Sequence, residues 1–308
     1  MKLTKFLAIP LALCFAPTAH ALIITPTFDA SYNAQDKLAV NTAILYYESV
    51  LTNNVTVNIN FANMTTGLAQ SSQYLYGIDY STLYGALNSQ KTSSDDISAV
   101  NSLSSGFSDQ ATGASLIGIT HADCSALGFN CGAISDGTIS VNLGLTDANR
   151  ADGISSGSYD LIGVVEHEID EILGSGGGGS LLGYGAVGIE DLFRYTAQGV
   201  RTFTTSGDNA YFSIDGGKTD LARFNNDGVG DYGDWHTSSI SRVQNAYGTP
   251  GVQNDIGVVE LTALDVIGWN RVSATLPPAD IPTPSVIVLL GSGLMALFTS
   301  TRRKRYVL

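Results

Sequence analysis

The sequence predicts an α+β fold, and three observations lead to this class. Hydrophobic residues make up 44% of the 308 residues, which is enough to bury a core. Some segments carry apolar residues at helical spacing, whereas others alternate apolar and polar residues in the manner of a strand. The expected elements follow the order helix, strands, helix and loops, which is typical of α+β proteins.

The first half is expected to begin with a helix over 34–51, where apolar residues recur every three or four positions. Strict alternation of apolar and polar residues then predicts a strand over 55–61. The stretch 65–108 is rich in Ser, Asn and Tyr and favours no particular element. Two further strands are expected over 115–120 and 138–143.

The second half is expected to contain a helix over 158–173. Gly174 and the glycine run 176–179 end it, because glycine continues a helix poorly. The last third is rich in Gly, Asn and Asp and ends in a short helix around 260–267. We therefore expect one domain over 22–274, with a loop-rich C-terminal part.

Charge is unevenly distributed along the chain. The formal net charge is −13, yet no acidic residue precedes Asp29 or follows Asp280. The body between the two basic ends is therefore more acidic than the whole chain, with a charge near −19. An acidic surface repels phosphate groups, so this composition argues against nucleic-acid binding.

Residues 1–21 have the composition of a secretory signal peptide. A basic start precedes the apolar stretch 6–15, which is too short to span a bilayer, and residues 19–21 match a small-x-small cleavage site. We expect the mature chain to begin near Leu22 and to be exported to the periplasm, the cell surface or the medium. A first helix of the fold is the alternative.

The C-terminal region predicts a membrane-associated sorting segment. A Pro-rich linker over 275–284 precedes the apolar and small residues 285–300, and basic residues 302–305 would stay cytoplasmic. Residues 282–305 resemble the PEP-CTERM sorting signal of Gram-negative bacteria, although Pro-Thr-Pro replaces Pro-Glu-Pro. The resemblance implies that 285–308 spans the membrane transiently and is removed by an exosortase-like protease; an ordinary single-span anchor is the alternative.

Two cysteines, Cys124 and Cys131, remain once the signal segment is removed. In an oxidising compartment, two cysteines seven residues apart predict one local disulfide. Two buried thiols are the alternative.

The helix predicted over 158–173 carries the side chains that favour chemistry. Helical geometry gathers its apolar residues on one face and sets His167 and Glu171 one turn apart on the other, with Glu168 beside them. Two ligands at this spacing can hold one metal ion, and an adjacent carboxylate can act as general base on metal-activated water.

A solvated face of an ordinary amphipathic helix is the alternative interpretation. Four acidic residues lie within 166–171, however, and the helix has no Lys or Arg. Like charges at helical spacing destabilise a helix, so this cluster favours a bound cation.

The motif at 167–174, His-Glu-Ile-Asp-Glu-Ile-Leu-Gly, resembles the zincin motif His-Glu-Ile-x-His-x-Leu-Gly with Glu171 in place of the second histidine. Residues 38–270 more closely resemble a bacterial family of secreted metalloproteases that often carry PEP-CTERM signals. Four further blocks carry this resemblance in order: Asp191–Tyr195, Phe212–Gly217, Gly233–Trp235 and Ala263–Trp269. It implies a zincin-like domain with a mixed sheet, an active-site helix, bound Zn²⁺ and peptide-bond hydrolysis.

The identity of the third metal ligand stays open from spacing alone. One zincin group takes it from a downstream carboxylate, and Asp191, 24 residues after His167, opens a family block. Asp191 is therefore the preferred third ligand, with Glu190 and His236 as alternatives, and a helix N-cap is its alternative role. Separately, Asn225–Asp234 alternates oxygen-bearing side chains with glycines and is a candidate Ca²⁺ loop, with a surface turn as the alternative.

We expect an exported metal-dependent endopeptidase that acts on proteins or peptides. His167, Glu171 and Asp191 are expected to hold the metal. Glu168 is expected to take a proton from the attacking water as general base. The alternative is a non-catalytic cell-surface or extracellular-matrix protein built on a degenerate zincin scaffold.

Overall fold

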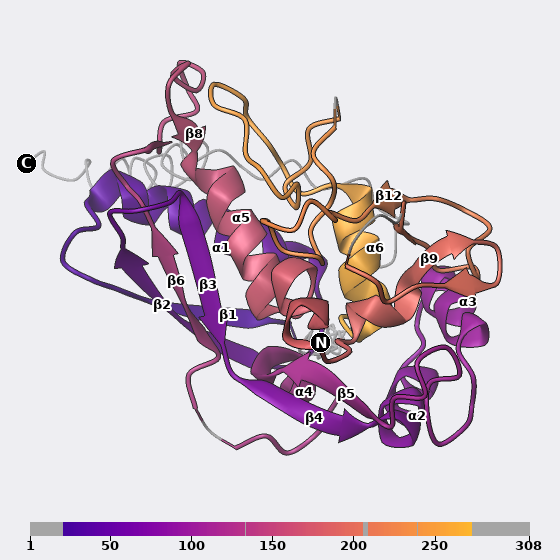
Figure 1. Ribbon diagram of the computed structural model, residues 1–308. Coiled ribbons are helices and arrows are strands. Elements are labelled where there is room, and N and C mark those ends of the chain that lie inside the picture. The colour runs from indigo at the N-terminus through magenta and orange to yellow at the C-terminus, as the bar shows by residue number, and fades with distance from the viewer. Residues whose placement is uncertain (1–20, 133, 206–208, 239, 273–308) are drawn as a thin grey trace, which may run out of the picture. The chain divides into compact units, whose positions relative to one another are not determined.

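A mixed four-stranded sheet in the order β1-β2-β6-β3 underlies the fold (Figure 1). The computed structural model describes residues 21–132, 134–205, 209–238 and 240–272. The strands are β1 (Ile23–Phe28), β2 (Thr56–Asn63), β6 (Gly137–Val141) and β3 (Ala69–Gln73). The first three run parallel, whereas β3 pairs antiparallel with β6 and forms an edge of the sheet. The structure therefore confirms the predicted α+β class with a mixed sheet.

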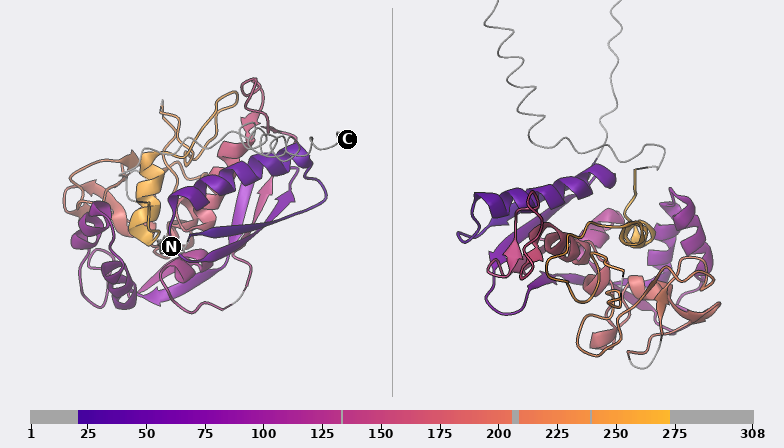
Figure 2. Two further views of the ribbon diagram at one scale, coloured as in Figure 1. Left: turned by 180° about the vertical axis from the view of Figure 1, so that it is seen from behind. Right: turned by 90° about the horizontal axis from the view of Figure 1, so that it is seen from above.

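Two helices cover one face of this sheet, α1 (Ala34–Val50) and α5 (Leu161–Ile172) (Figures 1 and 2). Val57, Ile59 and Phe61 of β2 are buried, and the alternate residues Thr56, Asn58 and Asn60 are exposed. A sheet with one covered face produces this alternation, which is why β2 could be predicted. The phenol of Tyr47 in α1 links the helices by donating to Asp170 Oδ1 of α5 at 2.7 Å.

Local interactions set the boundaries of both helices. Asn33 caps α1 by accepting from the Asp36 amide, and the Asp36 carboxylate accepts from the Asn33 amide in return. Helix α5 starts later than predicted because Tyr159–Asp160 form strand β8, paired with β7 (Thr146–Asp147). Its last residue is Ile172, and the chain turns away at Gly174, whose φ of 95° suits glycine.

The remaining helices and strands surround this layer pair. Strands β4 (Leu75–Asp79) and β5 (Leu116–Thr120) form an antiparallel pair. The other helices are α2 (Tyr80–Ser89), α3 (Ser94–Ser102), α4 (His121–Ala126) and α6 (Val258–Ile267). Short 3-10 turns occur at Gly176–Gly178, Leu182–Tyr184 and Glu190–Phe193. A small sheet has the order β10 (Val200–Arg201), β9 (Arg194–Ala197), β11 (Tyr211–Phe212) and β12 (Ala222–Arg223).

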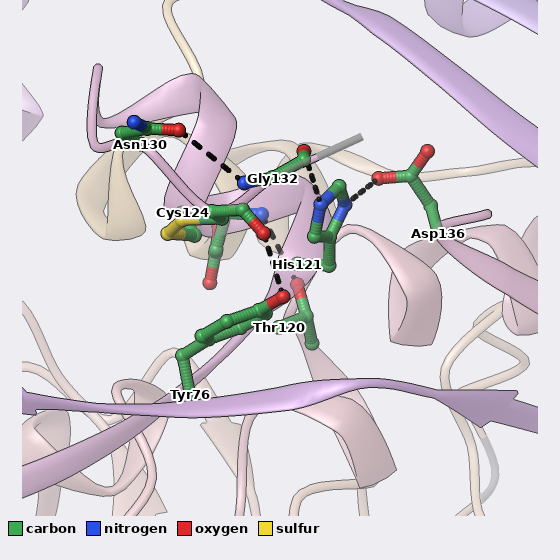
Figure 3. Close-up of a disulfide and its surroundings, with 9 residues drawn as sticks. Tyr76, Thr120, His121, Cys124, Asn130, Gly132 and Asp136 are labelled. Carbon is green, nitrogen blue, oxygen red and sulfur yellow. Dashed lines mark hydrogen bonds and ion pairs between the residues drawn. A yellow bond between two sulfur atoms is a disulfide. The ribbon is translucent and has the colours of Figure 1, made fainter. Parts of the chain in front are cut away.

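The predicted disulfide between Cys124 and Cys131 is confirmed, with the two Cα atoms 6.2 Å apart (Figure 3). The imidazole of His121 contacts this loop and the strand-side carboxylate of Asp136. Its Nδ1 lies 2.6 Å from Asp136 Oδ1, and its Nε2 lies 3.2 Å from the Gly132 carbonyl oxygen (Figure 3). His121 therefore has a structural role beside the loop.

The described residues belong to one compact unit that ends at Val272. The predicted signal segment up to residue 20, the linker over 275–284 and the sorting segment 285–308 lie outside the described residues. Among the described helices, none has the length and apolarity needed to cross a membrane.

Candidate metal centre

Helix α5 presents three polar side chains to a cleft of about 560 Å³. His167, Glu168 and Glu171 line this cleft, as the helical spacing predicted. Edge strand β3 contributes one wall, and residues between 230 and 254 contribute another. The loop-rich C-terminal part therefore brings side chains to the polar face of α5.

The imidazole of His167 turns one nitrogen toward two carboxylates. Its Nδ1 lies 2.9 Å from the Val243 carbonyl oxygen, which can only accept, so Nδ1 carries a proton and Nε2 is left for the cleft. Nε2 lies 3.6 Å from Glu171 Oε1 and 3.7 Å from Asp234 Oδ2. Atoms that share one tetrahedral zinc ion at about 2.1 Å are separated by about 3.4 Å. Both distances from Nε2 are close to this value, and one potential ligand atom of each of the three residues lies within 4.8 Å of the other two.

Each of these two carboxylates has one oxygen held by a neighbour and one directed at the cluster. Ser71 Oγ of β3 donates to Glu171 Oε2 at 2.5 Å, and Glu171 Oε1 is buried without a hydrogen-bond partner. Gln244 Nε2 donates to Asp234 Oδ1 at 2.8 Å, so Oδ2 faces His167. Orienting contacts of this kind typically surround metal ligands. The residues present therefore fit a divalent cation.

The charges in the cleft also favour a cation. None of the described residues that line it is Lys or Arg. Burial raises the pKa of Asp234, His167 partly opposes the rise and Glu171 adds to it, so that the pKa reaches about 7. Burial lowers the pKa of His167, but Asp234 and Glu171 outweigh this and raise it well above its usual value. A bound cation would relieve the repulsion among these carboxylates.

Glu168 lies beside the cluster with a free oxygen. The side chain is 5% exposed, lines the cleft, and its Oε2 has no hydrogen-bond partner. Burial and the neighbouring Glu171 raise the pKa of Glu168 well above its usual value. A buried carboxyl with a raised pKa beside a metal-like cluster suits proton transfer.

The glycine run after α5 packs its backbone directly against the cluster. A Cβ added at Gly177 would lie 2.5 Å from Glu171 Oε1, and one at Gly176 would lie 3.0 Å from Asp234 Oδ1. A Cβ at Gly178 would meet the Glu171 carbonyl oxygen at 1.9 Å. These glycines therefore end the helix and also allow the close approach that the site requires.

Asp191, the preferred third ligand from sequence, does not join His167 and Glu171. Its Oδ1 accepts from Ser180 Oγ at 2.7 Å, and its Oδ2 accepts from the amides of Leu181 and Gly188 at 3.1 and 2.8 Å. Both oxygens are therefore occupied in holding the turn over 180–191. The third position beside His167 and Glu171 is taken by Asp234.

The two alternative ligands also lie outside the cluster. Glu190 is buried behind the glycine run, where Ser175 Oγ donates to its Oε1 at 3.2 Å. A Cβ at Gly179 would lie 2.7 Å from Glu190 Oε2, so Glu190 supports the run from its other side. His236 is exposed. Neither belongs to the group of three potential ligands found among the described residues.

The candidate Ca²⁺ loop Asn225–Asp234 uses its central carboxylate within the turn. Asp227 Oδ1 accepts from the amides of Val229 and Gly230, and its Oδ2 accepts from the phenol of Tyr247 at 2.5 Å. Asp234, at the end of the loop, faces His167 instead. The described contacts are those of a surface turn.

Sequence reasoning missed Asp234, Gln244 and Ser71. A signal for Asp234 was present, since it lies in the block Gly233–Trp235, but no helical or strand spacing relates it to His167. Gln244 and Ser71 carry no local signal, because they reach the site only through the packing of distant segments.

Comparison with known proteins finds no family model that matches the chain, and no curated protein or solved structure that matches it significantly. Any function must therefore be argued from the residues of the cleft.

Proposed function

We propose that this chain is an exported metal-dependent endopeptidase with a zincin-like catalytic domain. One observation carries the proposal: His167 Nε2, Glu171 Oε1 and Asp234 Oδ2 converge in a cleft, beside the unpartnered carboxylate oxygen of Glu168. A histidine, two carboxylates and an adjacent general base form the donor set of a hydrolytic metal site.

In this proposal, His167, Glu171 and Asp234 hold the metal, and Asp234 replaces Asp191 as third ligand. One nitrogen and two oxygen donors suit Zn²⁺ and also harder divalent ions. A divalent ion bound there supplies Lewis-acid chemistry, because it acidifies water and polarises a carbonyl group.

Glu168 handles the proton in this proposal. Its free Oε2 accepts a proton from the attacking water and later delivers it to the leaving amine. Burial supports the first step, because a raised pKa makes the ionised carboxylate a stronger base toward the proton of the water.

The free edge of β3 supports a peptide as the substrate. The Asn142 amide donates to the Leu68 carbonyl, so the even-numbered residues face β6 in the antiparallel ladder. The backbone groups of Ala69, Ser71 and Gln73 are then directed to the unpaired edge, and all three residues line the cleft. An extended peptide can add to such an edge as a further strand.

Export and sorting form part of the same proposal. Residues 1–21 act as the signal peptide, and 285–308 act as a transient membrane anchor removed by an exosortase-like protease. The confirmed disulfide between Cys124 and Cys131 supports an oxidising compartment such as the periplasm or the cell surface.

The test uses the purified full-length protein, its divalent-metal content and its cleavage of casein. We expect about one metal ion per chain, lost on His167→Ala. Glu168→Gln should keep the metal and lose cleavage. Asp234→Asn should lower metal content, whereas Asp191→Asn should keep the metal and only reduce stability.

A wild-type protein that holds no divalent metal and cleaves no casein would support the alternative, a surface or matrix protein on a degenerate scaffold. Retention of metal by Asp234→Asn together with loss in Asp191→Asn would instead restore the ligand set expected from sequence.

A further inference from the structure

The cleft has two chemically different ends on either side of the metal-like cluster. Ser71, in the middle of β3, contacts Glu171 and marks the centre. At one end, a Cβ on Gly248 would lie 3.1 Å from Tyr159 and 3.4 Å from Leu68. The other end, beyond Glu171, is lined by residues that include Leu181, Tyr184 and Asp231. A peptide lying along β3 would extend into both ends.

Each end has a carboxylate, but only one of them is neutralised. Asp160, at the Tyr159 end, accepts from Arg150 Nε at 2.9 Å and from its second guanidinium nitrogen at 2.6 Å. Asp231, at the other end, receives no side-chain hydrogen bond or ion pair from the residues that the structure describes. Arg150 also pairs with the exposed Asp255, so this end is not free of charge, but its cleft-lining carboxylate has a cationic partner. Among the described residues, the Asp231 carboxylate has none.

Asp231 lies close to the cluster and is held in place by its loop. A Cβ on Gly177 would lie 2.5 Å from Glu171 Oε1 and 3.0 Å from Asp231 Oδ2, so both carboxylates reach the same part of the cleft. Asn225 Nδ2 donates to the Asp231 carbonyl oxygen at 3.3 Å, and Asp227 anchors the turn through Tyr247. The carboxylate is therefore presented from an ordered turn.

An apolar wall stands beside this anion. Leu181 lines the cleft but is largely buried, and Tyr184, which also lines it, is 84% exposed. A Cβ on Gly183 would lie 3.5 Å from the Tyr232 ring, so the turn that carries Tyr184 packs against the loop of Asp231. Long cationic side chains bury their methylene groups on such surfaces and place the charge beyond them, and guanidinium groups also stack on tyrosine.

We propose that this end of the cleft is a specificity subsite for an arginine or lysine side chain of the substrate, with Asp231 pairing the charge and Leu181 and Tyr184 contacting the aliphatic stem. The inference rests on the proposed peptidase function and names the substrate class. A free peptide amino group has a charge but no stem to cover the apolar wall, which is why a side chain is favoured.

The test compares arginine with citrulline, its uncharged isostere, in otherwise identical peptides. N-acetylated peptide pools, each with one residue or the other at a single fixed position, are given to the full-length protein. We expect kcat/KM to favour arginine about three- to fivefold at one position, because Asp231 is exposed and water screens the contact. Asp231→Asn should bring this ratio near one. Asp220→Asn, which removes an exposed charge outside the cleft lining, should keep it.

Binding and metal content separate this inference from the proposed function. Binding of the same pools to Glu168→Gln, measured by fluorescence anisotropy, should show the same preference, and Asp231→Asn should keep its metal. Equal cleavage and binding of both pools at every position would overturn the subsite while leaving the peptidase proposal intact. Loss of metal from Asp231→Asn would also overturn it, since Asp231 would then be a ligand. If nothing is cleaved, the peptidase proposal fails, and the binding ratio still decides the subsite.

Discussion

Replacing Gly177 with alanine should weaken metal binding selectively. The added methyl group would lie 2.5 Å from Glu171 Oε1, which is about 1 Å short of an ordinary contact. Gly177 has no left-handed φ, so its backbone accepts alanine and the conflict falls on the carboxylate. Metal–ligand distances tolerate only about 0.2 Å, so Glu171 would lose its position as a ligand. We expect metal affinity to fall about 10- to 100-fold.

Metal titration against a chromophoric chelator measures the affinity, and thermal unfolding with and without EDTA measures the linked stabilisation. Such a loss of affinity removes about 1.4 to 2.7 kcal/mol of metal-dependent stability at fixed metal concentration. The matched control is Gly85→Ala in α2, where an added Cβ meets nothing within 4 Å. It should leave metal affinity unchanged and stabilise the helix by about 0.5–1 kcal/mol. Wild-type metal affinity in Gly177→Ala would refute the placement of Glu171 as a ligand.

Three further predictions concern stability. Tyr47→Phe removes the hydrogen bond to the buried Asp170 carboxylate and should cost about 1–3 kcal/mol in urea unfolding; no change would mean that water replaces the phenol. Replacing both Cys124 and Cys131 with serine opens a short loop and should cost about 2–3 kcal/mol, and reduced wild-type protein should match this variant. Burial raises the pKa of Asp265 to about 6, so the folded state holds a proton that the unfolded state has released, and stability falls as pH rises from about 4 to 6. In Asp265→Asn, the free energy of unfolding should depend less on pH over this range. An unchanged pH dependence would contradict the raised pKa of Asp265.

Local patterns predicted the elements that have one buried face. Helix α1 and strand β2 each bury an apolar stripe at their own period, so their positions could be read within a few residues. Strand β3 could not be found, because its sequence Ala-Gln-Ser-Ser-Gln lacks apolar alternation. It is a strand because β6 pairs with it along its whole length. Pairing between distant segments cannot be recognised from the few residues of one segment.

The sequence by itself determined the helical part of the site, whereas tertiary structure decided how the site is completed. His167, Glu168 and Glu171 share one side of α5 because helical geometry relates positions one turn apart, wherever the helix lies. Ser71 contacts Glu171 although the two are 100 positions apart in the sequence, and Gln244 approaches His167 although these are 77 positions apart. Asp191 stays in its turn because backbone amides occupy its carboxylate. Asp234 joins the cluster because one of its carboxylate oxygens faces His167. That difference depends on how the loops pack, and residue spacing does not encode it.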